Sequence, residues 1–447
     1  MFGFLSSLEF SGSKTAIVLC AVTAIAVFDL VRRCKHRPTH LLFAVVLGTA
    51  LSLGLIRIAE VFLQQGTGSH PVAAAAGFVL VLLGWRGLFG PWDAQTKTVM
   101  LGTFLFWISL HIIAGEGGSL SARLIAAAVA LLPALIWCWL FLRYHRERIG
   151  NVVLLFLAGM LSTVPILFYD TLVRRGVEMQ FFFFHIRPES FSRTTQSLVT
   201  QLQPEGAADS MLWATLLSFL FVGLIEEVSK YWVLSRSGRS IFSSIDDVMQ
   251  LSIIAAIGFA FAENVVNPVY FTAFVREYLL HGAAPDIMAF VSNVLGRSVL
   301  TSMVHIVSTG VMGYYLGLAI FAGPYLKEQR ASGKVFPILS ALHGLLRLPE
   351  ISLFRVQMLS TGLLAAIGLH GLFNFLVTLP ELLPGNPQSI ADIIGPSAPS
   401  FLNAVPFLLI PALFYVVGGF WLLTALFERK ANMRERGRLV VQEVFVA

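Results

Sequence analysis

About eleven apolar segments, each near the length of a membrane-spanning helix, divide this chain. A helix needs about 20 apolar residues to cross the hydrocarbon core of a bilayer. The segments lie near 15–31, 40–63, 72–90, 98–114, 123–142, 151–172, 210–234, 247–267, 298–322, 356–379 and 401–427. Only 13% of the residues are charged and 56% are hydrophobic, whereas soluble globular proteins have about 25% charged residues. The sequence therefore predicts an all-α polytopic transmembrane helix bundle with about eleven spanning helices, and it excludes a disordered chain or a secreted disulfide scaffold.

The orientation in the membrane follows from the basic loops. Lysine and arginine gather in short segments between the apolar runs, at 32–37, 143–148, 236–239 and 327–334, and in the tail at 429–438. Cytoplasmic loops carry such an excess, so we expect the C-terminus in the cytoplasm. The net charge of +6 is explained by these basic loops. We therefore expect the lipid bilayer as a partner and expect no binding of nucleic acid. The stretch Val335–Pro349 is short, and we expect it to lie at the interface or to re-enter.

The same pattern divides the chain into three parts. Residues 1–205 form an N-terminal six-helix membrane region, 210–380 a polar-centred core, and 381–447 a final membrane helix with a basic cytoplasmic tail. The long connecting segment 173–209 carries four phenylalanines beside basic residues. That composition suits an interfacial anchor or, alternatively, a substrate-docking surface.

The predicted core places polar side chains, most of them ionisable, at membrane depth on four consecutive helices. These groups are Glu226, Glu227 and Lys230; Glu263 and Asn264; Arg297 and His305; and His370 with Asn374. Ionisable groups inside a bilayer are costly and tend to mark function. At 1.5 Å per residue from the inner boundary, His305, His370 and Glu263 lie at roughly 18–24 Å and Glu226 at roughly 13 Å.

Spacing within these helices adds detail. Glu226 and Lys230 are four residues apart, with the acid in the better N-terminal position for a helical ion pair. Glu227 is turned about 100° from Glu226. One glutamate can therefore pair with Lys230 while the other faces a neighbouring helix. His370 and Asn374 share a helix face.

Two carboxylates and two imidazoles in a low dielectric can do several things. They can bind a metal such as zinc, or a glutamate can activate water without a metal. They can carry protons or ions in a transporter. They can also form an interhelical polar clasp, worth about 1 kcal/mol per hydrogen bond. A single buried glutamate favours the clasp, whereas polar groups on four consecutive helices favour a functional site.

The order of these motifs resembles the PrsW family of intramembrane proteases. The matching residues are Glu226, Glu227 and Lys230; Phe259, Glu263 and Asn264; Arg297, His305, Gly313 and Tyr314; then His370 and Asn374, with Asp247 at the family's acidic position. The resemblance covers about 211–379. The family is distantly similar to the CAAX prenyl endoprotease and bacteriocin-processing superfamily.

The resemblance implies an intramembrane peptidase of the metallo- or glutamate type, which cleaves a membrane-protein substrate, such as a single-pass protein, within or next to the bilayer. Glu226 or Glu227 is then the general base, with Lys230 holding the other. Glu263, His305 and His370 bind a metal, for which zinc is the candidate, or position the water. Asn264 and Asn374 are candidate oxyanion donors. The family also implies a bacterial plasma (inner) membrane.

The sequence leaves three other interpretations open. A prenyl-protein endoprotease is disfavoured, because Glu263 stands where those enzymes usually have histidine. A proton- or ion-coupled transporter could use the same buried residues, but the sequence shows no internal repeat of the kind that many transporters have. A catalytically idle scaffold is disfavoured by the intact set of polar residues.

Overall fold

The bundle of membrane helices expected from the sequence is confirmed. The computed structural model describes residues 40–64, 71–90, 92–114, 120–143, 147–176, 179–181, 184–186, 207–267, 269–281, 284–395 and 397–435. Within these ranges eight helices are long and apolar enough to cross a membrane: Leu41–Glu60, Leu120–Leu142, Ile149–Arg174, Met211–Ser237, Ile245–Val266, Ile287–Ile320, Glu350–Leu382 and Leu409–Glu428. Each of them corresponds to one of the segments predicted from the sequence.

The remaining three predicted spans have different outcomes. Segment 15–31 lies outside the described residues. Segments 72–90 and 98–114 are helices α4 (Pro71–Leu88) and α5 (Ala94–Ala114), but their described residues do not qualify as candidate spans. The count of about eleven spans is therefore not confirmed over the described part of the chain.

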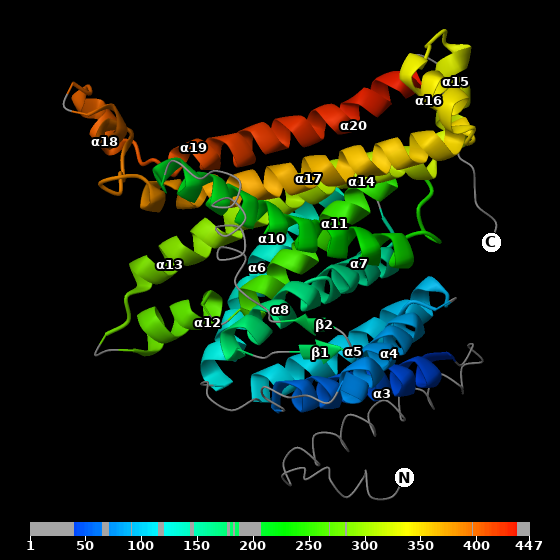
Figure 1. Ribbon diagram of the computed structural model, residues 1–447. Coiled ribbons are helices and arrows are strands. Elements are labelled where there is room, and N and C mark those ends of the chain that lie inside the picture. The colour runs from blue at the N-terminus through cyan, green and yellow to red at the C-terminus, as the bar shows by residue number, and fades with distance from the viewer. Residues whose placement is uncertain are drawn as a thin grey trace, which may run out of the picture.

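The N-terminal helices form one side of the bundle (Figure 1). Besides α4 and α5 they are α3 (His40–Gln64), α6 (Leu120–Leu142), α7 (Ile149–Leu161) and α8 (Val164–Arg175). Helix α3 packs on α5, α5 packs on α7, and α6 and α7 both pack on the central helix α11. The N-terminal half therefore supports one side of the C-terminal half.

The C-terminal half contains the helices on which the polar residues were predicted. Its elements are α10 (Ala207–Ser237), α11 (Ile245–Val266), α12 (Phe271–Phe274), η1 (Val275–Leu280), α13 (Ile287–Gly296), η2 (Arg297–Thr301), α14 (Ser302–Ile320), α15 (Ala322–Ala331), α16 (Pro337–Leu346), α17 (Glu350–Leu382), α18 (Ile390–Ile394), η3 (Ser400–Ala404), α19 (Leu409–Ala412), η4 (Leu413–Gly418) and α20 (Gly419–Glu435). Helix α14 packs between α11 and α17, and α17 packs on α10. The four polar helices are thus neighbours in space.

The central and peripheral helices differ sharply in burial. The apolar windows of α11 and of the span that contains α14 are each 89% buried, compared with 28% for α10 and 33% for α17. Because a membrane helix exposes its apolar side chains to lipid, the outer faces of α10 and α17 are suited to the bilayer. Their inner faces carry the polar residues toward the two central helices.

Two glycines bring α7 and α11 into backbone contact. A Cβ atom on Gly159 would lie 1.9 Å from the carbonyl oxygen of Ala255, and one on Gly258 would lie 2.1 Å from that of Phe156. Small residues allow membrane helices to approach this closely, which increases their van der Waals contact. The contact fixes α11, and with it the polar residues at its C-terminal end.

The connecting segment 173–209 is described only in part. It contains two short strands, β1 (Met179–Phe181) and β2 (Phe184–Ile186), which pair with each other in antiparallel orientation. Residues 187–206, most of the predicted interfacial segment, lie outside the described residues. The stretch Val335–Pro349, between α15 and α17, contains the ten-residue helix α16, which is too short to cross a membrane.

Candidate active site

The polar side chains of α10, α14 and α17 meet in the interior of the bundle. Glu227 and Lys230 are fully buried, and Glu226, His305 and His370 are nearly so. Helix α10 packs on α17 and also contacts α14, so the polar side chains on its inner face reach those of both helices. The structure therefore brings both glutamates and both histidines together, including Glu226, whose sequence-based depth differed from the others.

Glu227 is held by four donors. Its Oε1 atom accepts from Lys230 Nζ at 2.6 Å, from His370 Nδ1 at 2.9 Å and from Ser308 Oγ at 3.3 Å. Its Oε2 atom accepts from Thr309 Oγ1 at 3.0 Å. Of the two glutamates, Glu227 is thus the one that Lys230 holds. Charge-assisted bonds of this kind are among the strongest in proteins, so this carboxylate is fixed in place.

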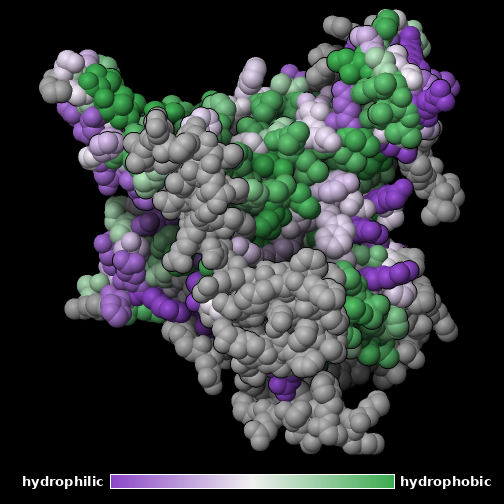
Figure 2. Space-filling view, viewed as in Figure 1, coloured by the Kyte–Doolittle hydropathy of each residue, from purple (hydrophilic) through white to green (hydrophobic). Residues whose placement is uncertain are grey.

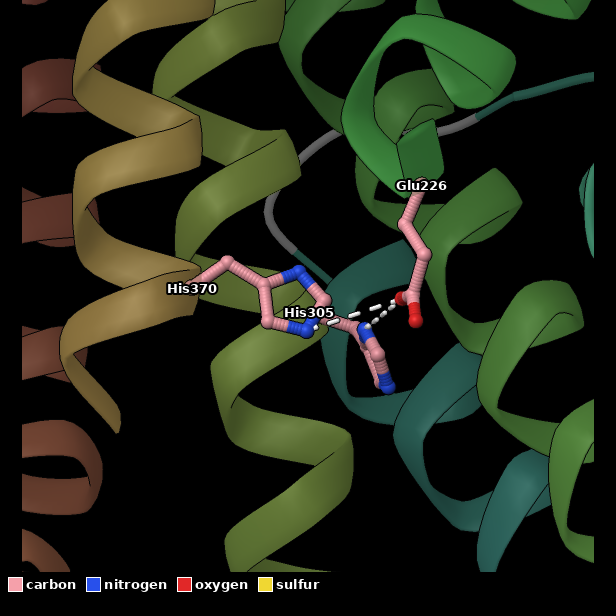
Figure 3. Close-up of side chains that lie close together, drawn as sticks. All are labelled: Glu226, His305 and His370. Atoms are coloured by element: carbon pink, nitrogen blue, oxygen red, sulfur yellow. Dashed lines mark ion pairs between the residues drawn. The ribbon is translucent and has the colours of Figure 1, made fainter. Parts of the chain in front are cut away.

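Glu226 has a different environment. Its Oε2 atom is buried and has no hydrogen-bond partner among the described residues. The nearest nitrogen atoms are His370 Nε2 at 3.5 Å, Lys230 Nζ at 3.9 Å and His305 Nδ1 at 4.0 Å. Figure 3 shows the carboxylate pointing toward both imidazole rings. A buried polar atom without a partner costs about 1–3 kcal/mol, so this position is one that an additional ligand would stabilise.

The hydrogen bonds assign the proton positions on His370. Since a carboxylate only accepts, the Nδ1 atom of His370 carries the hydrogen that it donates to Glu227. In neutral imidazole the Nε2 atom then has a free lone pair, and this atom faces Glu226. A carboxylate on one ring nitrogen is the usual way in which proteins orient a metal-binding histidine.

His305 has both ring nitrogens engaged. Lys230 Nζ donates to its Nδ1 atom at 3.0 Å, and its Nε2 atom donates to Glu263 Oε2 at 3.1 Å. Its ring packs on Phe259, with centroids 4.9 Å apart, and the Lys230 ammonium lies 4.0 Å from the Phe259 ring centroid. A ligand at Nδ1 of His305 would therefore replace the contact with Lys230, which would keep its bond to Glu227.

A second group of polar residues forms the more accessible edge of the cluster. Arg297, the first residue of the π-helical segment η2, donates to Glu263 Oε1 at 3.3 Å and to Asn264 Oδ1 at 2.7 Å. Its guanidinium lies 3.1 Å from the ring centroid of Tyr270. The Glu263 side chain is 14% exposed, more than any of the buried groups around Glu227. Short π-helical segments are frequent at functional sites.

Asn374 and Asp247 lie apart from the hydrogen-bonded cluster. Asn374 is half-buried one helical turn beyond His370, and its side chain makes no hydrogen bond to the cluster within the described residues. Asp247 is buried at the start of α11, where it accepts from the backbone N–H of Ser243 at 3.0 Å and from the Ser243 hydroxyl. Asp247 therefore stabilises the beginning of α11 rather than contacting the cluster.

Ser308 and Thr309 were not predicted from the sequence. They follow His305 by three and four residues, so helical periodicity places all three on one face of α14. This spacing is the signal that could have identified them. Tyr270 lies in a short segment between helices, and nothing in its sequence context indicates a contact with Arg297.

The described charged side chains of the cluster do not balance one another. It contains three carboxylates, on Glu226, Glu227 and Glu263, and two cations, on Lys230 and Arg297. With neutral imidazoles one negative charge is left over, and Glu226 is the carboxylate whose Oε2 atom has no hydrogen-bond partner among the residues that the structure describes. An uncompensated buried charge is strongly unfavourable, so the site is suited to a bound cation or an added proton.

The geometry fits a metal ion. Glu226, His305 and His370 each offer one ligand atom, and these atoms lie within 4.8 Å of one another. Ligand atoms around tetrahedral zinc are about 3.4 Å apart, given metal–ligand distances of about 2.1 Å. The distance of 3.5 Å between Glu226 Oε2 and His370 Nε2 agrees with this value. The group differs from the set predicted from the resemblance in that Glu226 takes the place of Glu263. Glu263 pairs instead with the Nε2 atom of His305 and with Arg297.

The fold and the site together define an integral membrane protein with a buried carboxylate–imidazole centre that could bind a metal. The family model of the PrsW family intramembrane metalloproteases matches residues 147–393, more than half of the chain, and the chain belongs to this family. Comparisons with curated proteins and with solved structures found no match. The matched region begins before α7, so it includes the helix that contacts α11 through Gly159 as well as all four polar helices.

Proposed function

We propose that this protein is a zinc-dependent peptidase that hydrolyses a peptide bond of a membrane-associated protein within or next to the bilayer. Family membership supports a peptidase and a metal. The observation that carries the proposal is the buried Glu226 Oε2 atom, which has no hydrogen-bond partner in the described part of the chain and faces two imidazole nitrogens.

In this proposal Glu226, His305 and His370 hold the metal. A bound zinc ion lowers the pKa of a coordinated water and polarises a carbonyl group. The other residues of the cluster orient these side chains for metal binding. Glu227 accepts from Nδ1 of His370 and so keeps the Nε2 lone pair directed at Glu226. The same carboxylate balances the positive charge of Lys230 through an ion pair.

Glu227 is therefore a positioning residue and not the proton acceptor. All of its hydrogen-bonding capacity toward the cluster is used by Lys230, His370, Ser308 and Thr309, and its side chain is fully buried. A general base must reach the water that it deprotonates, and Glu227 has no exposed surface with which to do so.

Glu263 is the proton acceptor in this proposal. It lies at the accessible edge of the cluster and contacts His305, and Arg297 holds its carboxylate in place. It accepts the proton of the attacking water and returns it to the leaving amine, a role worth typically 10²–10⁴-fold in rate.

Asn264 and Asn374 supply candidate donors for the oxyanion. The Oδ1 atom of Asn264 accepts from Arg297, which fixes the orientation of the amide and leaves its two N–H donors for another acceptor. Donors aimed at the developing oxyanion typically contribute 10²–10³-fold in rate. Asn374 is one turn from His370 and would act only with a substrate bound.

The expected substrate is a membrane protein, such as a single-pass protein, because the cluster is enclosed by helices long enough to span a bilayer. We further propose that the protein resides in a bacterial plasma (inner) membrane as a multi-pass protein with its C-terminus in the cytoplasm. The basic segments between the apolar runs support this orientation. A proton- or ion-coupled transporter is not favoured, since the chain belongs to a protease family.

Metal content of the detergent-purified full-length protein tests the proposal. We expect about one zinc per chain in the wild type by mass spectrometry, from the ligand set of a catalytic zinc site. Glu226→Ala and His370→Ala should lose the metal, whereas Glu263→Gln should keep it and lose activity. Activity is followed as new N-termini in the membrane proteome of cells that express each variant.

The outcomes separate the two ligand sets. Loss of the metal in Glu263→Gln but not in Glu226→Ala would replace our assignment with the set Glu263, His305 and His370. A folded wild type that neither contains nor takes up metal would overturn the metallopeptidase. New N-termini that are equally abundant with Glu226→Ala would contradict catalysis at this site.

A further inference from the structure

A separate pocket lies at the end of the bundle where α15, α16 and α17 meet. Its cavity volume is about 490 Å³. Basic, acidic and apolar side chains line it together: Lys327, Arg330, His343, Glu350, Leu326 and Ile351. None of these residues belongs to the cluster around Glu226. The pocket is therefore a candidate ligand site distinct from the candidate active site.

The polar wall of the pocket carries a surplus of positive charge. Lys327 and Arg330 are three residues apart on α15 and so share a helix face. Arg330 forms an ion pair with Glu350, whereas Lys327 is exposed and has no ion-pair partner within the described ranges. The Nδ1 atom of His343 donates to the backbone carbonyl of Leu348 at 2.7 Å. The ammonium group of Lys327 can therefore bind an anionic ligand.

Helix α16, which contributes His343 to the pocket lining, also carries exposed apolar side chains. On helix α16, Ile338 is 68% exposed and Leu345 is 79% exposed, while Leu339 is buried and anchors the helix on the core. Phe336, just before α16, packs edge-on against Phe354 of α17. Figure 2 shows hydrophobic and hydrophilic residues side by side over this end of the molecule. Such an apolar surface is suited to acyl chains rather than to water.

The position of the pocket agrees with the boundary of a membrane. It lies between the end of the span Ile287–Ile320 and the beginning of the span Glu350–Leu382. The basic segment 327–334 is predicted to be cytoplasmic, which is the side where anionic lipids attract juxtamembrane lysine and arginine. Helix α16 is short, apolar and at the same level, as expected of a helix that lies in the interface.

We propose that this pocket binds the headgroup of an anionic phospholipid. The lipid phosphate lies beside Lys327, with Arg330 as an additional donor, and the acyl chains extend along the exposed face of α16. A zwitterionic phosphatidylcholine fits less well, because its choline cation cancels the phosphate charge near Lys327. Basic pockets between membrane helices bind anionic headgroups in this way.

The test uses the purified full-length protein in a non-ionic detergent. Dioctanoyl-phosphatidylglycerol, dioctanoyl-phosphatidylcholine and sodium phosphate are titrated separately, and binding is followed by the thermal unfolding midpoint and by native mass spectrometry. We expect saturable binding of the phosphatidylglycerol only. One surface charge contributes about fivefold in affinity, so Lys327→Gln should weaken binding about fivefold and Lys327→Glu about thirtyfold.

The matched control is Lys334→Glu, which makes the same charge change in the same basic segment but outside the pocket lining. We expect it to retain wild-type affinity within about twofold, since its effect is only long-range and screened. Leu345→Asn should weaken the binding of phosphatidylglycerol without changing any charge. The proposal is overturned if phosphatidylcholine binds equally well, if inorganic phosphate alone reproduces the shift, or if Lys327→Glu binds like Lys334→Glu.

Discussion

Replacement of Glu227 by glutamine separates its two functions, holding Lys230 and orienting His370. The substitution keeps the size of the side chain but removes the charge that Lys230 Nζ contacts at 2.6 Å. Lys230 is fully buried, and the other nearby carboxylate oxygen, on Glu226, is 3.9 Å away. Removal of one partner of a buried ion pair costs about 3–5 kcal/mol. We therefore expect Glu227→Gln to lower the free energy of unfolding by about this amount.

The second effect concerns the metal. Without the carboxylate, the Nδ1 atom of His370 loses its charged acceptor, and groups that orient metal-bound histidines are typically worth 10–100-fold in metal affinity. The double variant Glu227→Gln/Lys230→Met removes the unpaired ammonium. It should recover most of the lost stability, while the zinc affinity stays 10–100-fold below that of the wild type.

Two measurements follow these effects independently. Denaturation with sodium dodecyl sulfate in mixed micelles reports the unfolding free energy, and zinc competition with a chromophoric chelator reports the metal affinity. Our reasoning would be refuted by a double variant that is no more stable than Glu227→Gln alone. Wild-type zinc affinity in a folded Glu227→Gln protein would refute the role of Glu227 in orienting His370.

Three further predictions concern other parts of the structure. Gly159→Ala should destabilise the fold by about 1–3 kcal/mol, because its Cβ would lie 1.9 Å from a carbonyl oxygen of α11, whereas Gly102→Ala meets its nearest atom at 3.5 Å and should change the same denaturation midpoint little. Arg297→Gln should lower the rate of substrate cleavage while leaving zinc content unchanged, since Arg297 holds Glu263 and, within the described ranges, forms no hydrogen bond or ion pair with the proposed metal ligands. Loss of zinc would contradict this. The pKa of Asp392 is held below its usual range, with the hydrogen bond from the backbone N–H of Ser389 as the largest cause. This carboxylate therefore stabilises the start of α18 at pH values above its pKa of about 3.9 in the unfolded chain. The stabilisation is lost as the pH falls through the lower pKa of the folded state. Hydrogen exchange of residues 388–395, corrected for intrinsic rates, should therefore increase on acidification, and Asp392→Asn should remove that dependence.

Much of the helical architecture could be predicted because hydropathy alone decides where a chain crosses a membrane. Eight of the predicted spans match candidate spans in the structure. The predictions were weakest at α4 and α5, where the described residues fall short of a candidate span. In α5 the polar side chains of Lys97 and His111 lie near its two ends, and such residues blur the boundary between a spanning and a partly buried helix.

The composition of the polar cluster was predictable, but its pairings were not. Helical spacing identified Glu226, Glu227 and Lys230 as neighbours, yet it could not decide which glutamate pairs with the lysine. That choice depends on the rotation of α10 against α17, which places His370 Nδ1 against Glu227. The depth estimate separated Glu226 from the histidines because it ignored helix tilt and the length of the side chains. Membrane helices are tilted by about 20° on average, so depth along the sequence is only a guide to contact.

The unequal burial of the helices has a consequence for how this sequence can change in evolution. Helix α11 is packed on every side, so nearly every position along it meets a protein atom, and Gly258 has no room even for a methyl group. Helices α10 and α17 have a lipid-facing side on which one apolar residue can replace another at little cost. Among related chains, substitutions on α10 and α17 should recur with the 3.6-residue helical period, while α11 should show uniformly few substitutions and no period.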